Sequence, residues 1–140
     1  MNSLTELKGW FINLNESTLG DIVSYYDENV FFKDPFNEFN GREKLKKLFL
    51  HMFITFKNPH FIFIDTIENS KEIFMTWDFI FSYKEKLFKI HGSSHLKLND
   101  EEIIVYHRDY WDVGEELLLK IPFIKSLYGI LQNKFSMSFN

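Results

Sequence analysis

The 140-residue sequence lacks cysteine altogether and contains only three prolines and six glycines. Without cysteine, disulfide bonds and thiolate metal sites are excluded, and a reducing, cytoplasmic location is predicted. No stretch approaches the ~20 consecutive apolar residues of a membrane span, and the first residues lack the basic and apolar regions of a signal peptide. We therefore expect no membrane span, and we do not favour contact with a membrane.

Positive charge is also scarce, because 16 Lys and Arg stand against 20 Asp and Glu and give a formal net charge of -4. A nucleic-acid-binding protein needs a basic face for the phosphates, so no nucleic-acid partner is expected. The sequence has no phosphate-binding loop and no nucleophile elbow. His91 and His95 lie about 13 Å apart on one expected strand, too far to share an ion. We predict neither a metal nor a cofactor.

Aromatic residues, by contrast, are abundant. The chain has 17 Phe, 6 Tyr and 3 Trp, and aromatic residues make up 19% of it. Their side chains carry a large apolar area with few rotamers. Either they fill a Phe-rich core, or some of them line a cavity. A chain of this length fits one domain with a full core.

The apolar periodicity predicts helices first and strands later. The first 14 residues repeat apolar side chains at helical spacing, residues 18–26 carry a second helix signal, and residues 42–53 form a stronger stripe. A short strand is expected at 30–32. From residue 60 the period changes to two, which predicts strands at 60–67, 73–83, 88–98 and 103–111. This order predicts an α+β domain over residues 1–114, with a curved antiparallel sheet packed on N-terminal helices.

The last segment, residues 115–140, reads as an amphipathic helical extension that Pro122 interrupts. Asp112 is placed to cap its first turn. The extension is too apolar to stand in water, so it caps the domain, packs in a dimer or touches a membrane surface. We predict that it packs on the same domain.

The turn at residues 84–85 fixes the register of one hairpin. Pairing Tyr83 with Lys86 places Trp77 opposite Gly92 and sets Phe79 on the same face as Trp77. Glycine inside a strand marks either a bend of the sheet or a close approach of other atoms to the backbone. This hairpin therefore predicts an aromatic end for the inner face.

The loop at residues 99–102 fixes the next hairpin independently. Pairing Leu98 with Ile103 places Ser94 opposite His107, with Asp109 on the same face. Polar groups on a buried face are costly unless they pair with each other or meet a ligand. Because residues two apart on a strand lie ~7 Å apart, we expect a ligand or water, rather than a direct contact, to join His107 and Asp109.

A family resemblance rests on two stretches of sequence. Asp34-Pro35-Phe36 follows an aromatic strand and precedes Gly41 at a helix start, and the last strand ends in His107-Arg108-Asp109-Tyr110-Trp111-Asp112. Over about residues 4–115 this order resembles the SnoaL-like branch of the nuclear transport factor 2-like superfamily. The resemblance implies a cone-shaped pocket and a homodimer through the outer sheet face. The long tail resembles that of one uncharacterised bacterial subgroup.

The resemblance reaches more distantly to ketosteroid isomerase. Asp34 falls where that enzyme keeps its general base, whereas Trp10 and Ser94 replace its two oxyanion donors with weaker ones, so steroid isomerisation is not implied. SnoaL-type polyketide cyclases use an acid/base aspartate on a late strand, a role that Asp109 matches. An aspartate before proline also caps turns, so Asp34 has a purely structural alternative.

Together these observations predict a small apolar carbonyl compound as the partner, and isomerase, cyclase or dehydratase chemistry that uses aspartate as acid and base. The expected catalytic residues are Asp34, His107 and Asp109. The expected ligand-binding residues are Trp10, Trp77, Phe79, Ser94 and Trp111. The alternative is a non-catalytic ligand-binding or dimerisation module, which a filled interior would favour.

Overall fold

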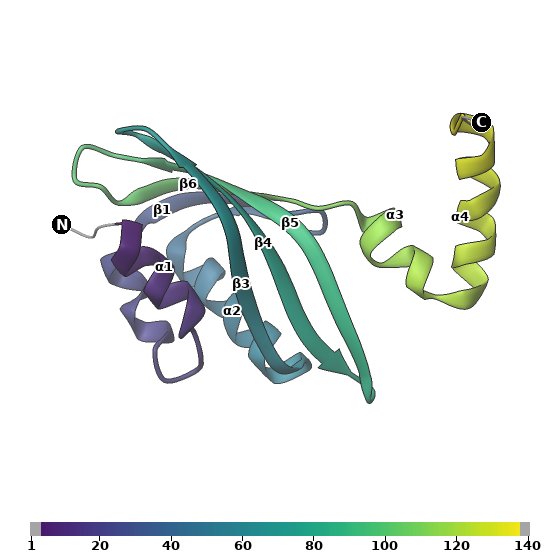
Figure 1. Ribbon diagram of the computed structural model, residues 1–140. Coiled ribbons are helices and arrows are strands. Elements are labelled where there is room, and N and C mark those ends of the chain that lie inside the picture. The colour runs from purple at the N-terminus through teal and green to yellow at the C-terminus, as the bar shows by residue number, and fades with distance from the viewer. Residues whose placement is uncertain (1–3, 138–140) are drawn as a thin grey trace.

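The computed structural model describes residues 4–137, and the outer ends of the two predicted segments, residues 1–3 and 138–140, lie outside that range. The elements follow in the chain order α1 (Leu4–Ile12), η1 (Leu19–Ser24), β1 (Tyr26–Lys33), β2 (Glu38–Asn40), α2 (Arg42–Thr55), β3 (Lys57–Glu68), β4 (Glu72–Tyr83), β5 (Lys86–Leu98), β6 (Ile104–Tyr110), α3 (Val113–Glu116), η2 (Leu118–Lys120) and α4 (Pro122–Phe135). The strands form one curved sheet that arches over α1 and α2 (Figure 1). The predicted α+β class with a bent sheet is confirmed.

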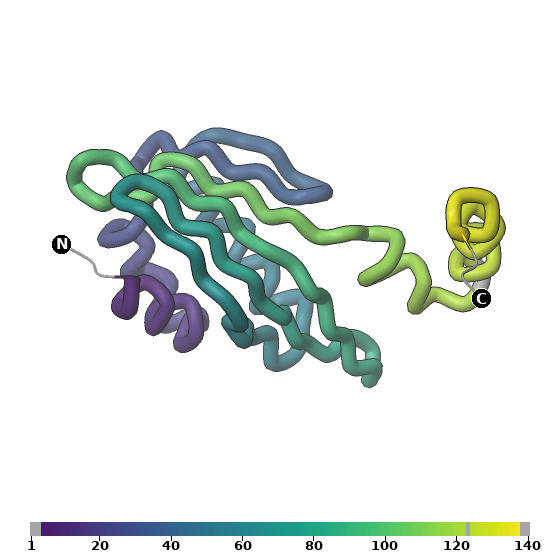
Figure 2. The backbone as a smooth tube through the Cα atoms, turned by 45° about the horizontal axis from the view of Figure 1, so that its top comes forward, coloured from purple at the N-terminus to yellow at the C-terminus, as the bar shows by residue number. Residues whose placement is uncertain are grey.

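Helices α1 and α2 cover the concave face of the sheet (Figure 2). Helix α1 buries Leu7, Trp10 and Phe11, and α2 buries Leu45 and Phe49, because these residues repeat at three- and four-residue intervals on one side of each helix. Residues 19–24, where a helix start was expected, form a 3-10 turn. The two α-helices therefore close one side of the core, and the other side of the sheet is left open over most of its length.

The strand order is β2-β1-β6-β5-β4-β3, and the pairing of β1 with β6 is parallel whereas the others are antiparallel. The sequence indicated a strand only at residues 30–32, but β1 begins at Tyr26, which pairs with Ile104 of β6. Because β6 lies far from β1 in the sequence, no local pattern predicts this pairing. It buries Tyr26 completely.

The predicted register of the β4–β5 hairpin is confirmed, with Tyr83 opposite Lys86 and Trp77 opposite Gly92. A Cβ atom at residue 92 would lie 2.6 Å from Cη2 of Trp77 and 3.0 Å from the carbonyl oxygen of Tyr110. Glycine is therefore required because the indole crosses the strand at this point. Of the two alternatives for Gly92, the close approach is the one observed.

The predicted register of the β5–β6 hairpin is wrong by up to two residues. Leu98 pairs with Ile104 rather than Ile103, and Ser94 lies opposite Asp109 rather than His107. Because the shift at Ser94 is an even number, His107 and Asp109 keep the predicted face.

The loop before β6 explains this shift. The side chain of Asn99 accepts hydrogen bonds from the backbone N–H groups of Glu101 and Ile103, and Glu102 has a φ of 62°. Ile103 is thereby held in the loop. Val105 then has no partner between two paired residues, which is a β-bulge.

Two apolar clusters fill the space between sheet and helices. The larger one joins α1, α2 and the middle of the sheet. The smaller one lies toward the β4–β5 turn and consists of Trp77, Phe79, Phe81 and Ile90. The rings of Phe56 and Phe81 pack against each other, with their centroids 4.3 Å apart. Much of the aromatic content is therefore core.

The C-terminal extension leaves the sheet at the end of β6. Asp112 caps α3 as predicted, accepting a hydrogen bond from the Glu115 N–H at 3.1 Å. Pro122 opens α4 instead of kinking a longer helix. The Lys120 side chain donates to the Lys89 carbonyl at 2.5 Å, which joins the start of the extension to β5. Helix α4 itself stands away from the sheet in both views (Figures 1 and 2).

Within residues 4–137, no helix has the length and apolar character that crossing a bilayer requires.

Candidate functional site

A chain of hydrogen bonds runs through the concave side of the sheet and contains two of the three expected catalytic residues. Trp77 Nε1 donates to Ser94 Oγ at 2.9 Å, and Ser94 Oγ donates to Asp109 Oδ1 at 2.5 Å. On the other side, His107 Nε2 lies 2.6 Å from the same Oδ1, and His107 Nδ1 lies 2.9 Å from the Tyr26 hydroxyl. We call these five residues the Asp109 network.

The direction of each hydrogen bond follows from Asp109, because an ionised carboxylate can only accept. Nε2 of His107 therefore carries a proton and donates to Oδ1, and in the neutral imidazole Nδ1 then accepts from the Tyr26 hydroxyl. Burial raises the pKa of Tyr26 well above its ordinary value, and the nearby charge of Asp109 raises it further, so the hydroxyl keeps the proton that it donates. Two arms thus end at one carboxylate oxygen, Trp77 acting through Ser94 and Tyr26 through His107.

The direct contact between His107 and Asp109 corrects the expectation that a ligand or water would join them. The ~7 Å spacing of alternate residues describes the backbone, and side chains on a strand lean along its direction. The imidazole and the carboxylate lean toward each other and meet at 2.6 Å. Of the two alternatives that the sequence left open, mutual satisfaction of the pair is present.

The network separates a small inner cavity from an open groove, and Asp109 lines both. The inner cavity has a volume of about 10 Å³ and is lined by Phe11, Phe61, Phe63, Met75, Trp77, Ser94, His107 and Asp109. Such a space holds about one water molecule. The groove has a volume of about 490 Å³ and is lined by Lys33, Asp34, Pro35, Arg108, Asp109, Tyr110, Trp111 and Asp112.

Exposure within the network distinguishes Asp109 from its partners. Its side chain is 19% exposed, against 4% for His107. Trp77, Ser94 and Tyr26 are buried. The carboxylate is therefore the point where this network meets solvent.

Asp34 forms the local turn that the sequence offered as its structural alternative. Its Oδ1 accepts hydrogen bonds from the backbone N–H groups of Phe36 at 2.8 Å and Asn37 at 2.7 Å. The Asn37 side-chain amide donates to it as well. Asp34 does not line the inner aromatic cavity, but it lines the groove together with Asp109.

Three of the five expected ligand-binding residues lie at these two spaces. Trp77 and Ser94 line the inner cavity, and Trp111 lines the groove. The Trp111 ring meets the Phe36 ring edge-on, with centroids 5.6 Å apart. An apolar wall therefore stands beside the Asp109 carboxylate.

The other two lie elsewhere. Trp10 donates from Nε1 to the Thr18 carbonyl at 3.0 Å, so its polar edge points into the loop before η1. Phe79 packs in the aromatic cluster, 4.8 Å from the Phe61 ring centroid. Neither residue lines the inner cavity or the groove.

Sequence reasoning missed Tyr26. It lies 81 positions from His107 in the chain and was assigned to a helical segment. The one signal that could have found it is general: a tyrosine inside an apolar run needs a partner for its hydroxyl when it is buried.

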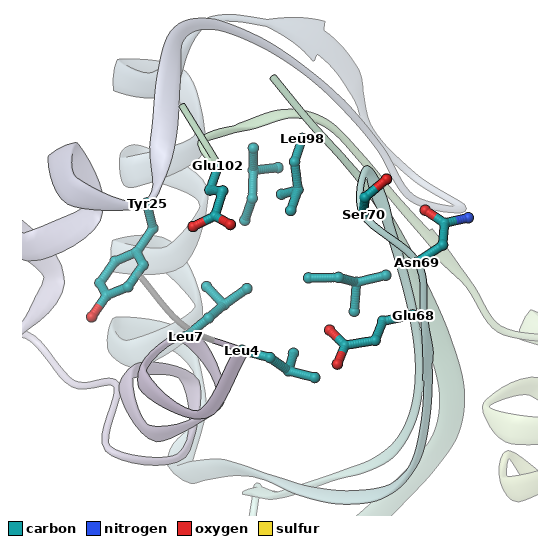
Figure 3. A pocket seen from close by; sticks show the side chains of 10 residues that line it. Leu4, Leu7, Tyr25, Glu68, Asn69, Ser70, Leu98 and Glu102 are labelled. Carbon is teal, nitrogen blue, oxygen red and sulfur yellow. The ribbon is translucent and has the colours of Figure 1, made fainter. Parts of the chain in front are cut away.

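A third space, the pocket in Figure 3, lies where β6 begins, at the end of the sheet opposite to the groove. It has a volume of about 140 Å³ and is lined by Leu4, Leu7, Tyr25, Glu68, Asn69, Ser70, Ile73, Leu98, Glu102 and Ile104. The carboxylates of Glu68 and Glu102 point into it over leucine side chains. None of the expected site residues belongs to it. Among residues 4–137, no group of three or more His, Asp or Glu side chains is arranged to hold a metal ion.

Comparison with known proteins decides the family. A family model described as a SnoaL-like domain matches residues 7–107. The chain belongs to the SnoaL-like family. The matched span contains His107 but ends before Asp109, and the C-terminal extension lies outside it. A comparison with curated proteins finds no match.

Solved structures similar to this SnoaL-like protein share its fold at low sequence identity. A protein with a ketosteroid isomerase-like fold from Catenulispora acidiphila, solved with trimethylamine, is 15% identical, with a TM-score of 0.68 and coverage of 83% of this chain and 92% of that chain. A proposed SnoaL-like polyketide cyclase from Jannaschia sp. CCS1 is 7% identical, with a TM-score of 0.67 and coverage of 82% and 92%.

A third similar structure is the epoxide hydrolase/cyclase-like enzyme SalBIII of pyran ring formation in salinomycin. It is 17% identical, with a TM-score of 0.66, and the match covers 77% of this chain and 88% of that chain. At these identities the three structures establish the fold.

Proposed function

We propose that this SnoaL-like protein binds a small apolar carbonyl compound in the groove and that Asp109 moves a proton beside the carbonyl. The chemistry is that of an isomerase, cyclase or dehydratase that needs no cofactor. The similarity to a proposed polyketide cyclase and to a cyclase-like enzyme supports this class of reaction.

The observation that carries the proposal is the asymmetry of the Asp109 carboxylate. Ser94 and His107 both hydrogen-bond to Oδ1, which fixes the orientation of the group. Oδ2 takes part in neither bond, and the side chain is 19% exposed. A general base must be held firmly and still reach the substrate proton. Oδ1 of Asp109 holds the carboxylate in place, and Oδ2 is free to reach the substrate proton.

The volumes support the groove, rather than the inner cavity, as the ligand site. The inner cavity holds about 10 Å³, too little for an organic molecule, whereas the groove, at about 490 Å³, lies in the usual ~300–1,000 Å³ range of ligand sites. Trp111 offers an apolar surface there. Lys33 and Arg108 also line the groove. Their charge favours the enolate oxygen that forms when a proton leaves the neighbouring carbon.

The test uses 2-tetralone, an apolar ketone with acidic α-hydrogens, in D₂O. The wild-type protein should accelerate exchange of these hydrogens for deuterium, followed by NMR. Asp109→Asn should lower the protein-catalysed rate by about 100-fold or more, the usual contribution of a general base. Asp100→Asn, which changes a carboxylate on an exposed loop, is the control and should keep the wild-type rate. Equal rates for Asp109→Asn and wild type contradict the proposal.

The filled interior favours a second candidate, a non-catalytic binding module. Phe11, Phe61 and Phe63 occupy the space that a cone-shaped pocket would offer. Binding of 2-naphthol, whose hydroxyl mimics an enol, separates the two candidates. A wild-type protein that binds 2-naphthol without accelerating exchange of 2-tetralone is a binding module. The cytoplasmic location and the homodimer stay predictions in either case.

A further inference from the structure

Helix α4 carries an apolar side that stays exposed among residues 4–137. Leu127, Ile130 and Leu131 are 54%, 57% and 56% exposed, and Phe135 is 85% exposed. Such exposed fractions are typical of polar surface residues, but these four side chains are large and apolar. Such a contiguous apolar face marks an interaction site.

A close contact joins α4 to α3. The Tyr128 ring packs on Gly114 of α3 so closely that a Cβ atom there would lie 2.3 Å from Cε2 of the ring. This contact fixes α4 against α3, and both views place α4 beyond the end of the sheet (Figures 1 and 2). The apolar side of α4 is therefore presented outward.

The outer face of the sheet has a matching hollow. Its volume is about 290 Å³, and it is lined by Phe74, Thr76, His91, Gly92, Ser93, Tyr110, Asp112, Glu115 and Glu116. Exposed apolar side chains continue beyond it on β3, where Ile62 and Ile64 are about half exposed. The hollow thus has two aromatic lining residues, Phe74 and Tyr110, and exposed isoleucines lie next to it on β3.

The charges of the two surfaces are complementary. Helix α4 carries Lys125 and Lys134 and no acidic residue. The hollow has three carboxylates toward α3, those of Asp112, Glu115 and Glu116.

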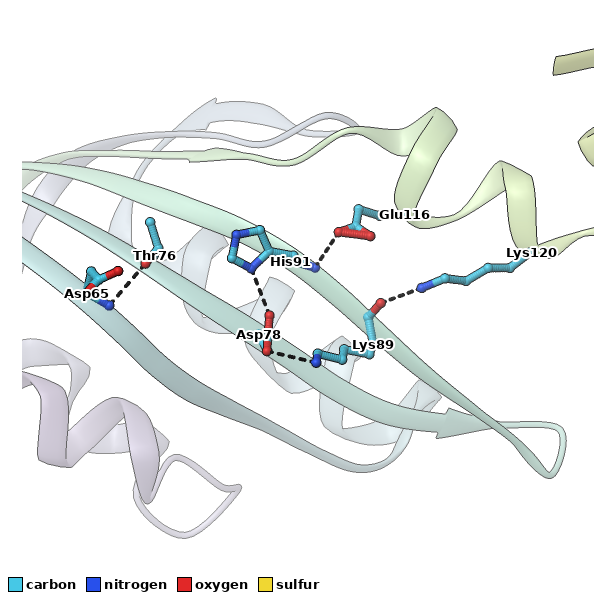
Figure 4. A network of polar contacts seen from close by, with 7 residues as sticks. All are labelled: Asp65, Thr76, Asp78, Lys89, His91, Glu116 and Lys120. Carbon is cyan, nitrogen blue, oxygen red and sulfur yellow. Dashed lines mark hydrogen bonds and ion pairs between the residues drawn. The ribbon is translucent and has the colours of Figure 1, made fainter. Parts of the chain in front are cut away.

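Two side chains on the outer face near the hollow have a partner in Asp78. Asp78 pairs with His91 at 2.9 Å and with Lys89 at 3.3 Å, and Glu116 accepts a hydrogen bond from the His91 backbone (Figure 4). Among residues 4–137, no salt bridge engages Asp112, Glu115 or Glu116. A lysine of a second copy can therefore pair with them.

We propose that α4 of each protomer packs into the outer-face hollow of a second copy, so that two chains exchange their C-terminal helices. A two-fold pair repeats each contact twice, and each copy supplies the surface that the other lacks. A 14-residue helix spans about 21 Å, shorter than the about 40 Å of a 12-residue strand, so α4 fits within the face. The inference does not depend on chemistry at Asp109.

The first test measures the mass in solution by light scattering. The wild-type chain should have twice the 16.9 kDa of one copy. Ile130→Glu should raise the dissociation constant of the dimer by more than about tenfold, because a charge placed in an apolar contact loses its hydration. Val23→Glu is the matched control, since Val23 is 54% exposed on η1, on the helix side of the sheet. It should leave the dimer unchanged.

The second test locates the helix and uses the lack of native cysteine. A chain with Ile130→Cys is mixed with a chain with Ser93→Cys and oxidised. A disulfide between the two different chains supports the exchange, and Ile130→Cys with Val23→Cys should give none. Four results overturn the proposal: a monomeric wild type, a dimer that Ile130→Glu leaves intact, disulfides only between two Ile130→Cys chains, or a monomer that pellets with phosphatidylserine vesicles.

Discussion

Two aspartate–histidine pairs lie on opposite faces of the same sheet. On the concave face, His107 meets Asp109 at 2.6 Å, and the two side chains are 4% and 19% exposed. On the outer face, His91 meets Asp78 at 2.9 Å, and the corresponding values are 57% and 14%. The chemistry of the pairs is the same, but only the inner histidine has a buried donor, Tyr26, behind it. Burial of the histidine and a supporting donor turn an ordinary aspartate–histidine pair into an oriented carboxylate.

The largest expected difference is in stability. His107→Ala should lower the free energy of unfolding by about 3 kcal/mol, because it leaves the buried Tyr26 hydroxyl without a partner and the Asp109 carboxylate with Ser94 as its one donor in the network. His91→Ala should cost less than about 1 kcal/mol, since its pair is solvated. Urea denaturation of both variants measures the difference. Similar losses in the two variants would remove the distinction between the faces.

Gly92 joins the two faces, because it lines the outer hollow and lets the Trp77 ring cross behind it. Gly92→Ala should cost about 2 kcal/mol by forcing the indole aside. Gly9→Ala is the control, because the space around Gly9 is open and alanine favours the helix. Denaturant titration should show a loss for the first variant and a small gain for the second. A neutral Gly92→Ala would mean that Trp77 is not fixed.

Tyr26→Phe should cost about 1 kcal/mol at neutral pH, because His107 Nδ1 loses its donor. Burial, and then the charge of Asp109, raise the folded-state pKa of Tyr26 above its ordinary value of 10.0. The folded chain therefore holds a proton that the unfolded chain releases above about pH 10, and stability falls there as pH rises.

In Tyr26→Phe, the free energy of unfolding should fall less steeply with rising pH above about pH 10, by up to about 1.4 kcal/mol per pH unit. Unfolding of the wild type, Tyr26→Phe and Tyr110→Phe between neutral and alkaline pH measures the slope. Tyr110 is exposed on the outer face and serves as the control. Equal changes of slope in the two variants would contradict the account.

The smallest effect concerns Asp78. Burial by itself would raise the pKa of Asp78, but hydrogen bonds from His91 and Lys89 outweigh it and lower the pKa below the ordinary value of 3.8. The pair therefore contributes above about pH 4 and is lost as pH falls through the lowered pKa. Asp78→Asn should lower the free energy of unfolding by less than about 0.5 kcal/mol at neutral pH. Denaturation at decreasing pH should show the difference between the variant and the wild type vanish. A loss as large as that of His107→Ala would contradict the solvated role of the pair.

The sequence predicted what local turns control and failed where distant segments meet. The register that places Trp77 opposite Gly92 follows from a two-residue turn, so it was predicted correctly. The register of Ser94 was wrong because the Asn99 side chain widens its loop and a bulge follows. The alternation of side chains along the last two strands did place Ser94, His107 and Asp109 on one face, because the register error at Ser94 is an even number.

The remaining features depend on tertiary packing. Tyr26 joins the site only because β1 lies parallel to β6, a pairing that no local pattern encodes. Asp34 was expected as a base or a turn cap, and the hydrogen bonds from Phe36 and Asn37 show the cap, whereas its role as a base stays a prediction. Whether aromatics line a cavity or fill it depends on rotamers, and here most of them fill it.

The central claim is that Asp109 presents one free oxygen to the groove while Ser94 and His107 hold the other. A crystal structure with 2-naphthol bound tests this most directly. The account predicts the naphthol hydroxyl at hydrogen-bond distance from Asp109 Oδ2, with the ring beside Trp111 and both bonds to Oδ1 unchanged. A naphthol bound in the pocket between Glu68 and Glu102, or one that leaves Oδ2 uncontacted, would contradict it.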